Sequence, residues 1–326
     1  MSNIASRIPS PLKKVLNLLT VSAFWLMVRT RTVNPLSPRW RFLRARMLRK
    51  SSESLAETYK RLGFFSPVVI GVGDQIRVSM DGIALSVEGT DRYFKTSSRA
   101  GANDGASMVT FLRKIGIVDP RTIVDLGANF GEVSLYFAKL FPRARIVAVE
   151  PSPKNLGVLR SNIDFQTFSC DRIEVHEIAI SSEIGICELF EAGGESSIVF
   201  QKSAHPIMVR TNSLAGFWKD NLLDKVEFVK VDIEGAAALL LDDLQTIGPK
   251  ASVWLIELEI DPEGLGPVPF FDLFDELGFA IADGETGSIF ADKVHALKFV
   301  AAGPKHTIKD FWFFERKLVP TASQNL

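Results

Sequence analysis

Acidic residues stand at the ends of short apolar stretches in this sequence. Asp125 lies in TIVDLG, Glu150 ends IVAVE, and Asp232 and Glu234 follow VEFVK in VDIEG. Each stretch is short and rich in β-branched residues, which predicts a strand covered on both faces. Ligands of an open α/β sheet bind outside the carboxyl ends of its strands, so we expect these carboxylates to meet at one ligand-binding edge.

The turn after the first of these strands indicates which ligand binds there. Gly127 and Gly131 bracket it, and a missing Cβ lets the backbone bend tightly and approach a ligand. A dinucleotide-binding turn needs glycine at three positions, but Asn129 and Glu132 occupy the second and third. Glu132 would repel a pyrophosphate, whereas Glu132 and Asp125 suit a cofactor with cationic groups. S-adenosylmethionine is such a cofactor, because it carries a sulfonium and an ammonium group.

Glu150 is placed to accept hydrogen bonds from both ribose hydroxyls of that cofactor. Ala179, at the end of the next predicted strand, is expected to lie against the adenine ring. The simpler alternative is that Asp125 and Glu132 only cap the start of a helix or lie on its surface. The full set of predicted cofactor-binding residues is Asp125, Gly127, Ala128, Asn129, Gly131, Glu150, Pro151, Ser152 and Ala179.

The later acidic motif supplies the predicted catalytic residues, Asp232, Glu234 and Lys230. Along an extended strand end these three side chains point to one side. A hydroxyl that attacks a methyl group must lose its proton, and a carboxylate that takes it contributes about 10²–10⁴-fold. Lys230 would keep Asp232 ionised or orient the acceptor. The alternative is a solvated ion pair at the end of a strand.

Other chemistry at this edge is less well supported by the sequence. A divalent ion could use Asp232, Glu234 and either Glu257 or Glu259 as oxygen ligands. No cluster of histidine and cysteine supports zinc, and we predict no metal. His205 could act as a base from a mobile lid, although a lone surface histidine is the simpler interpretation.

Three motifs, VDLGANFGE, VAVEPSP and VKVDIEGA, resemble the FkbM family of S-adenosylmethionine-dependent methyltransferases. The resemblance runs from roughly Ile123 to Asp283. It implies O-methylation of a hydroxyl on a sugar, glycolipid or polyketide-like metabolite, with the cofactor on Asp125, Gly127, Gly131 and Glu150. The family's acidic motif usually has a further acid two residues after its glycine, where this chain has Ala237. N- or C-methylation of a small molecule, or an inactive cofactor-binding interaction protein, are the alternatives.

The elements that must position these residues alternate between strands and helices. Strands are expected near 123–126, 146–149, 173–180, 226–231, 253–258, 279–282 and 311–315. Helices are expected near 104–115, 132–141, 153–162, 214–223, 236–244 and 270–277, the third of them capped by Ser152. This alternation predicts a doubly wound α/β fold, and the resemblance implies the mostly parallel, seven-stranded class I methyltransferase sheet with a Rossmann-like arrangement.

Three regions are expected along the chain. Residues 1–62 form an N-terminal helical and basic arm, 63–118 hold accessory β-hairpins and a lead-in helix, and 119–326 form the methyltransferase domain. The apolar run 15–28 would rise about 21 Å as a helix, short of the roughly 30 Å of a bilayer core. A basic cluster follows it, so residues 12–50 are predicted to contact an anionic membrane surface, which would favour a lipid-linked glycan acceptor. Alternatively, the arm packs on the domain or on a second subunit of a homodimer.

Composition limits the remaining possibilities. Of 326 residues, 46% are hydrophobic and 23% charged, which is ordinary for a globular protein. Lys plus Arg number 38, and so do Asp plus Glu. The chain therefore lacks the positive net charge that is typical of a nucleic-acid-binding protein. Two cysteines make no disulfide framework. We expect a cytoplasmic enzyme, peripheral on the membrane if the basic arm binds lipid.

Overall fold

The computed structural model describes residues 68–72, 75–80, 83–88, 104–191, 196–199, 205–261, 266–304 and 307–320. The N-terminal arm and its membrane contact at 12–50 lie outside these residues. The chain divides between Asp81 and Gly82 into two compact units. The three expected regions stay a prediction.

The smaller unit contains the first predicted hairpin. Strands β1 (Val68–Val72) and β2 (Gln75–Met80) pair antiparallel, with Val68 opposite Ser79. Strand β3 (Ile83–Glu88) belongs to the larger unit, where its Ile83 and Leu85 are buried.

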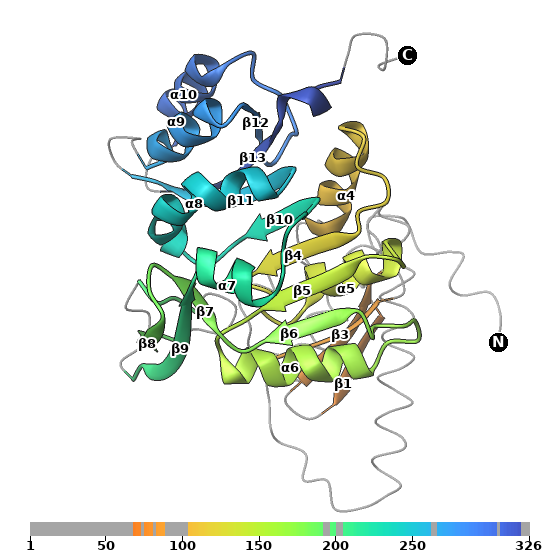
Figure 1. Cartoon of the computed structure of the whole chain (residues 1–326). Helices are drawn as coiled ribbons and strands as arrows, with labels where there is room; N and C mark the ends of the chain where they lie inside the picture. The colour runs from red at the N-terminus through yellow and green to blue at the C-terminus, as the bar shows by residue number, and fades with distance from the viewer. Residues whose placement is uncertain are drawn as a thin grey trace, which may run out of the picture. The chain divides into compact units, whose positions relative to one another are not determined.

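A seven-stranded sheet forms the centre of the larger unit (Figure 1). Its order is β12-β13-β11-β10-β4-β5-β6, and the two pairs that include β13 are antiparallel while the four others are parallel. The strands are β4 (Thr122–Leu126), β5 (Arg145–Val149), β6 (Ile173–His176), β10 (Phe228–Val231), β11 (Val253–Ile260), β12 (Phe279–Asp283) and β13 (Thr307–Glu315). The order reverses between β4 and β10, so the predicted doubly wound, mostly parallel sheet is confirmed.

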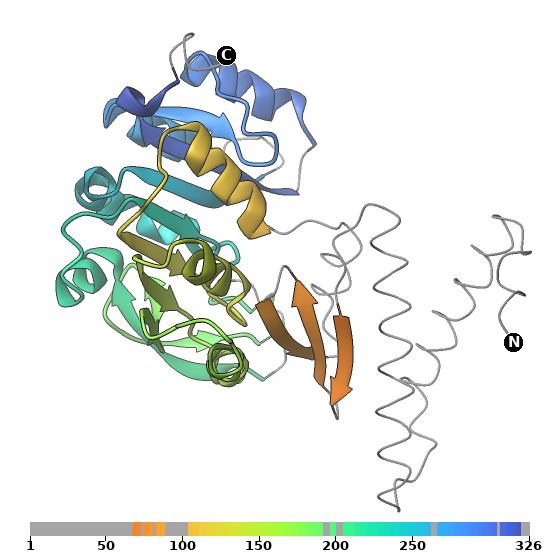
Figure 2. The ribbon, with the colours of Figure 1, turned by 90° about the vertical axis from the view of Figure 1, so that its right-hand side faces the viewer.

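Helices cover both faces of this sheet (Figure 2). Successive strand residues point to opposite faces, so Val124 packs with α7 (Leu214–Asp220), α8 (Leu241–Ile247), α9 (Val268–Glu276) and α10 (Lys293–Ala302). Ile123 packs on the other face with α4 (Asp104–Lys114) and α5 (Glu132–Leu140). Helix α6 (Pro153–Asp164) begins at the predicted cap, since the Ser152 hydroxyl accepts a hydrogen bond from Asn155 N.

Two expected elements differ from those observed. The single strand expected over 173–180 is wrong, because β6 ends at His176 and Ala179 pairs instead with Thr211 of a second sheet. That sheet has the order β7-β9-β8, from β7 (Ala179–Ser181), β8 (Gly185–Leu189) and β9 (Ile207–Ser213). The helix expected over 236–244 begins as the 3₁₀ helix η3 (Ala236–Leu240), after which α8 follows.

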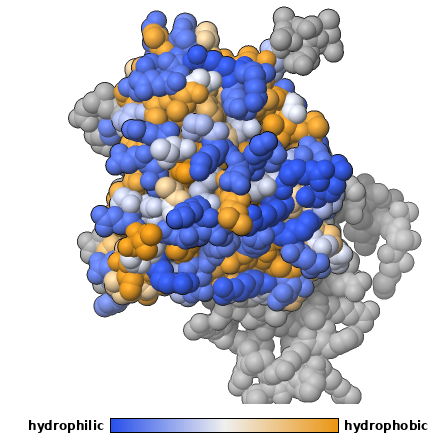
Figure 3. Space-filling view, in the orientation of Figure 1, coloured by the Kyte–Doolittle hydropathy of each residue, from blue (hydrophilic) through white to orange (hydrophobic). Residues whose placement is uncertain are grey.

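The second sheet also carries an apolar surface. Ile184, Ile186 and Met208 are exposed on and beside β8 and β9. Apolar surface is visible at the lower left of Figure 3, where Figure 1 shows these two strands. In the part of the chain that the structure describes, no helix combines the length and apolar character needed to cross a bilayer.

Candidate active site

The turn between β4 and α5 requires glycine at Gly127. This residue has a φ of 85°, in the left-handed region, and a Cβ there would lie 1.7 Å from the carbonyl oxygen of Asp232. The amides of Gly127 and Ala128 both donate to Val149 O, each at 2.9 Å. The turn is therefore fixed against the end of β5 and lies directly beside the loop that follows β10.

Glu150 follows β5 and is held by three donors of the protein. The carboxylate is 4% exposed and accepts from Asn129 N at 2.9 Å, Ser152 N at 2.9 Å and Asn155 Nδ2 at 3.2 Å. Burial raises the pKa of Glu150 to about 7, against the opposing effect of these hydrogen bonds. A carboxylate has about four acceptor positions, so Glu150 keeps capacity for a ligand in a fixed orientation.

Lys230 lies between two acids on one face of the sheet. Its Nζ is 2.9 Å from Asp232 Oδ2 and 3.7 Å from Asp125 Oδ1. Asp125 stands opposite Lys230 in register, is fully buried, and accepts from Ser134 Oγ at 2.6 Å. Burial alone would lower the pKa of Lys230, but Asp232 and Asp125 raise it well above its ordinary value, so the lysine is a permanent cation.

A cluster of carboxylates continues beyond Asp232. Oxygen atoms of Asp232, Glu234 and Glu257 all lie within 4.8 Å of one another. Glu257, on β11, stands opposite Asp310 of β13. Burial raises the pKa of Glu257 to about 9, and the charges of Asp232, Asp310 and Glu234 add to this effect. Glu259 is exposed and lies outside the cluster.

One cavity of about 390 Å³ joins these parts. The predicted residues that line it are Gly127, Ala128, Asn129, Glu150, Pro151, Ala179, Lys230, Asp232 and Glu234. Asp125, Gly131 and Ser152 are not among the lining residues, but Asp125 contacts Lys230 and the Ser152 amide donates to Glu150. No histidine occurs among the described residues of the lining, and His205 is exposed.

Sequence reasoning missed several residues of this cavity. Asn155 orients Glu150 from the first turn of α6, and Leu189 lines the wall from β8. Ile308 lines the far side from β13, whose place between β11 and β12 no local pattern indicates. Glu257 was considered only as a metal ligand. For Asn155 a signal existed, since it lies three residues after the predicted cap.

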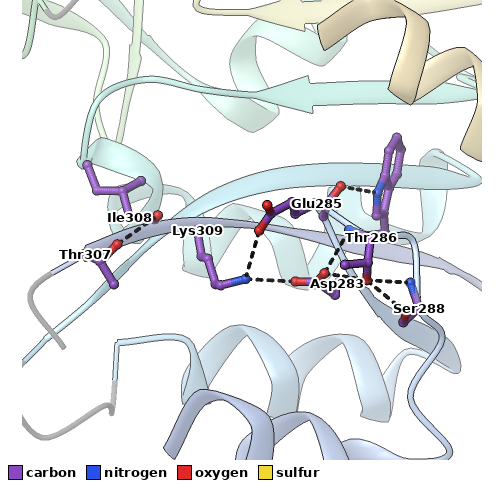
Figure 4. Close-up of polar contacts among 9 residues, drawn as sticks. Asp283, Glu285, Thr286, Ser288, Thr307, Ile308 and Lys309 are labelled. Atoms are coloured by element: carbon purple, nitrogen blue, oxygen red, sulfur yellow. Dashed lines mark hydrogen bonds and ion pairs between the residues drawn. The ribbon is translucent and has the colours of Figure 1, made fainter. Parts of the chain in front are cut away.

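The strand that carries Ile308 is fixed by a polar network (Figure 4). Lys309 Nζ lies 3.0 Å from Asp283 Oδ1, and Asp283 also accepts from Thr286 N at 2.8 Å and Thr286 Oγ1 at 2.6 Å. Burial would raise the pKa of Asp283, but Thr286 and Lys309 lower it below its ordinary value. Because side chains alternate along a strand, anchoring Lys309 on one face presents Ile308 to the other.

Comparison with known proteins agrees with this geometry. Residues 125–277 match the family model described as the methyltransferase FkbM domain. "Methyltransferase 1" of Beauveria bassiana (strain ARSEF 2860) is 24% identical over 141 residues, which are 36% of this chain and 56% of that protein. The chain thus spans little more than half of that relative.

Solved structures that resemble this chain include methyltransferases. A methyltransferase FkbM from Methylobacillus flagellatus KT has 16% identity and a TM-score of 0.38, over 60% of this chain and 44% of that one. The magnesium protoporphyrin IX methyltransferase of Synechocystis PCC 6803 has 12% identity and a TM-score of 0.41, over 70% and 86%. The three motifs, the sheet order and the family match agree, and the chain therefore carries an FkbM-family methyltransferase domain across residues 125–277.

Proposed function

We propose that this protein is an S-adenosylmethionine-dependent O-methyltransferase that acts on a hydroxyl of a sugar, glycolipid or polyketide-like metabolite. One observation carries the proposal. A single cavity is lined both by the glycine turn with Glu150, called here the cofactor side, and by the Lys230–Asp232 pair, called here the acceptor side. Two substrates could therefore meet inside it, which supports a transfer reaction more than simple binding.

The residues on the first side fit the proposed cofactor. Glu150 is oriented by three donors and retains acceptor capacity for ribose hydroxyls. Gly127 lines the cavity, and its missing Cβ lets the glycine turn lie against the carbonyl oxygen of Asp232. Glu132 begins α5 and is 8% exposed, so a carboxylate stands where a dinucleotide would place its pyrophosphate. When bound, S-adenosylmethionine supplies a methyl group on a positively charged sulfur.

The residues on the second side fit removal of a proton from the acceptor. Asp232 lines the cavity and lies 2.9 Å from Lys230 Nζ, so its carboxylate is placed to accept the hydroxyl proton. Glu234 lines the same wall and would orient the acceptor. The surrounding carboxylates would also accept a protonated amine, and this observation makes N-methylation the second candidate.

Calorimetry with S-adenosylhomocysteine tests the cofactor assignment. We expect the wild-type protein to bind this product and Glu150→Ala to bind it about tenfold to a hundredfold more weakly, because hydrogen bonds to a charged group contribute about 1.5–3 kcal/mol each. If the wild-type protein does not bind, the assignment is wrong.

Transfer of labelled methyl groups into cell extract tests the second side and identifies the acceptor. We expect Asp232→Asn to bind S-adenosylhomocysteine normally while transfer falls by about 10²–10⁴-fold. Asp224→Asn, at an exposed acid away from the cavity, is the matched control. Mass spectrometry of the labelled product distinguishes a methyl ether from a methylated amine, and the latter result would replace the O-methylation proposal with the N-methylation candidate.

We also propose that the acceptor is lipid-linked and that residues 12–50 hold the protein at the membrane surface. The basic cluster and the apolar run support this, and both lie outside the described residues. High salt should release the full chain from membranes, while a chain without residues 1–50 should be soluble at low salt. Equal partitioning of the two would contradict the proposal. Sedimentation of the full chain and of the chain without residues 1–50 would show whether the arm joins two subunits in the predicted homodimer.

A further inference from the structure

The loop that follows β10 carries Glu234 in a backbone conformation that needs support. Glu234 lines the cavity, and its φ of 52° lies in the left-handed region, which is unfavourable for a residue with a Cβ. The next residue, Gly235, also has a positive φ, of 85°. Non-glycine residues persist in this conformation at functional sites only where the surrounding structure holds them. The contacts of the loop therefore decide where the Glu234 side chain lies.

Two backbone hydrogen bonds hold the residues that flank Glu234. At the start of the loop, Asp232 N donates to Leu126 O of β4 at 3.0 Å. At its end, Ala236 N donates to Ile233 O at 3.3 Å, where the 3₁₀ helix η3 begins. Both bonds fix the course of the chain before and after Glu234, and neither of them acts on the Glu234 peptide group itself.

Ser197 contacts Glu234 directly, from a segment 37 residues earlier in the chain. The Ser197 hydroxyl donates to the carbonyl oxygen of Glu234 at 2.7 Å, and the direction is fixed because a carbonyl can only accept. The same hydroxyl oxygen accepts from Val199 N at 3.1 Å. Ser197 is 1% exposed, so water competes little for the bond to Glu234.

The backbone of Ser197 is itself held at the end of β8. Ser197 N donates to Phe190 O at 3.2 Å, and Phe190 N donates to Ser197 O at 2.9 Å, so the two residues form an antiparallel bridge. Next to Phe190, the Glu191 carboxylate accepts from the hydroxyl of Ser152 at 2.5 Å, which ties the same bridge to the start of α6. Because its backbone is fixed in this way, the Ser197 hydroxyl can support the loop instead of following it.

We propose that Ser197 is a positioning residue for methyl transfer, whose hydroxyl holds the Glu234 backbone in the left-handed conformation and so keeps the Glu234 side chain where it orients the acceptor. This inference rests on the proposed function and adds to it a residue that acts through Glu234. Ser197 is not among the lining residues, although its neighbours Ser196 and Ile198 line the cavity. The proposal requires the hydroxyl of Ser197, whereas a residue that only fills its buried site would need no more than the right size.

Hydrogen exchange measured by mass spectrometry tests the contact without any activity. Ser197→Thr and Ser197→Val are a matched pair, because both add nearly the same volume and only threonine keeps a hydroxyl. We expect the amides of residues 232–236 to exchange about tenfold faster in Ser197→Val than in Ser197→Thr, since losing one hydrogen bond favours local opening by about that factor. Exchange over α7 should be the same in both variants.

Two further variants complete this comparison. Ser197→Ala adds no volume, so its exchange compared with that of the wild-type protein gives the same test if the larger side chains do not fit. Ser182→Ala is the control, at an exposed serine in the turn between β7 and β8 of the same sheet, and it should leave the exchange of residues 232–236 unchanged. Wild-type exchange of residues 232–236 in Ser197→Ala, or equal exchange in the threonine and valine variants, would overturn the proposal.

Labelled-methyl transfer into cell extract tests the role of Ser197 in the reaction. Ser197→Val and Ser197→Ala should transfer about tenfold more slowly than Ser197→Thr, while all three bind S-adenosylhomocysteine within about twofold of the wild-type protein. A loss of S-adenosylhomocysteine affinity as large as the loss of rate would overturn the proposal, because Ser197 would then support the whole cavity. If the wild-type protein fails to bind S-adenosylhomocysteine, the proposed function fails, while the exchange comparison still decides whether Ser197 holds the Glu234 loop.

Discussion

The two sides of the cavity are built in different ways. Most of the cofactor side comes from one continuous segment, the β4–α5 turn through the start of α6, to which β7 adds Ala179. Its central carboxylate, Glu150, receives three hydrogen bonds from that segment. The acceptor side is assembled from β10, β11 and β13, and its carboxylates share one lysine. A local segment therefore supplies the hydrogen bonds of its own central carboxylate, whereas the sheet brings together carboxylates from strands that are distant in sequence.

The largest effect expected of any substitution is on the acceptor side. Lys230→Met keeps the volume of the side chain but leaves Asp125 and Asp232 without their shared cation. Removing one partner from a buried ion pair costs about 3–5 kcal/mol, so the free energy of unfolding in urea should fall by that amount. Lys219→Met, at an exposed lysine of α7, should change it by less than about 0.5 kcal/mol. Similar small losses in both variants would show that the acceptor side does not depend on Lys230.

The contact between the two sides gives the second prediction. Gly127→Ala puts a Cβ against the carbonyl oxygen of Asp232, and the left-handed conformation alone costs a non-glycine residue roughly 1–2 kcal/mol. We expect a loss of more than about 2 kcal/mol in unfolding free energy, with weaker binding of S-adenosylhomocysteine and slower transfer together.

Gly116→Ala separates strain from contact in that experiment. Gly116 has a φ of 88° but a Cβ there would have no atom within 4 Å. Gly116→Ala should lower the unfolding free energy only by the roughly 1–2 kcal/mol of the left-handed conformation, and it should leave cofactor binding unchanged. Equal losses in the two variants would mean that the Gly127–Asp232 contact adds nothing.

The same contrast explains what could be predicted from the sequence. The glycine turn, Glu150 and the Ser152 cap could be predicted because each signal lies within one strand–turn–helix unit. The break after His176 was missed, because 173–180 reads as one strand-like segment although its two ends pair in different sheets. The opposition of Glu257 and Asp310 was missed too, since it depends on where β13 inserts in the sheet.

The cofactor side should show its own pH dependence. The pKa of Glu150 is raised to about 7, and ribose hydroxyls bind its ionised form, so affinity for S-adenosylhomocysteine should fall about tenfold from about pH 8 to about pH 6. Calorimetry in buffers of different ionisation enthalpy should detect a proton released on binding near pH 7. Glu150→Ala should abolish this dependence. Unchanged affinity across the range would indicate that Glu150 stays ionised in the free protein.

The smallest effect is expected at the edge of the acceptor side. Lys309→Met removes the ammonium, which contacts Asp283 at 3.0 Å and lies over the ring of Phe299. Asp283 still accepts two hydrogen bonds from Thr286, so the loss of stability should be about 1 kcal/mol or less. Because β13 also carries Ile308, KM for the acceptor should rise while affinity for S-adenosylhomocysteine stays the same.

Lys317→Met is the control. It removes an exposed ion pair with Glu315 just after the same strand, and it should change neither the stability nor KM. Weaker cofactor binding by Lys309→Met would mean that β13 couples the two sides. The cofactor side would then not be formed by its local segment independently of the acceptor side.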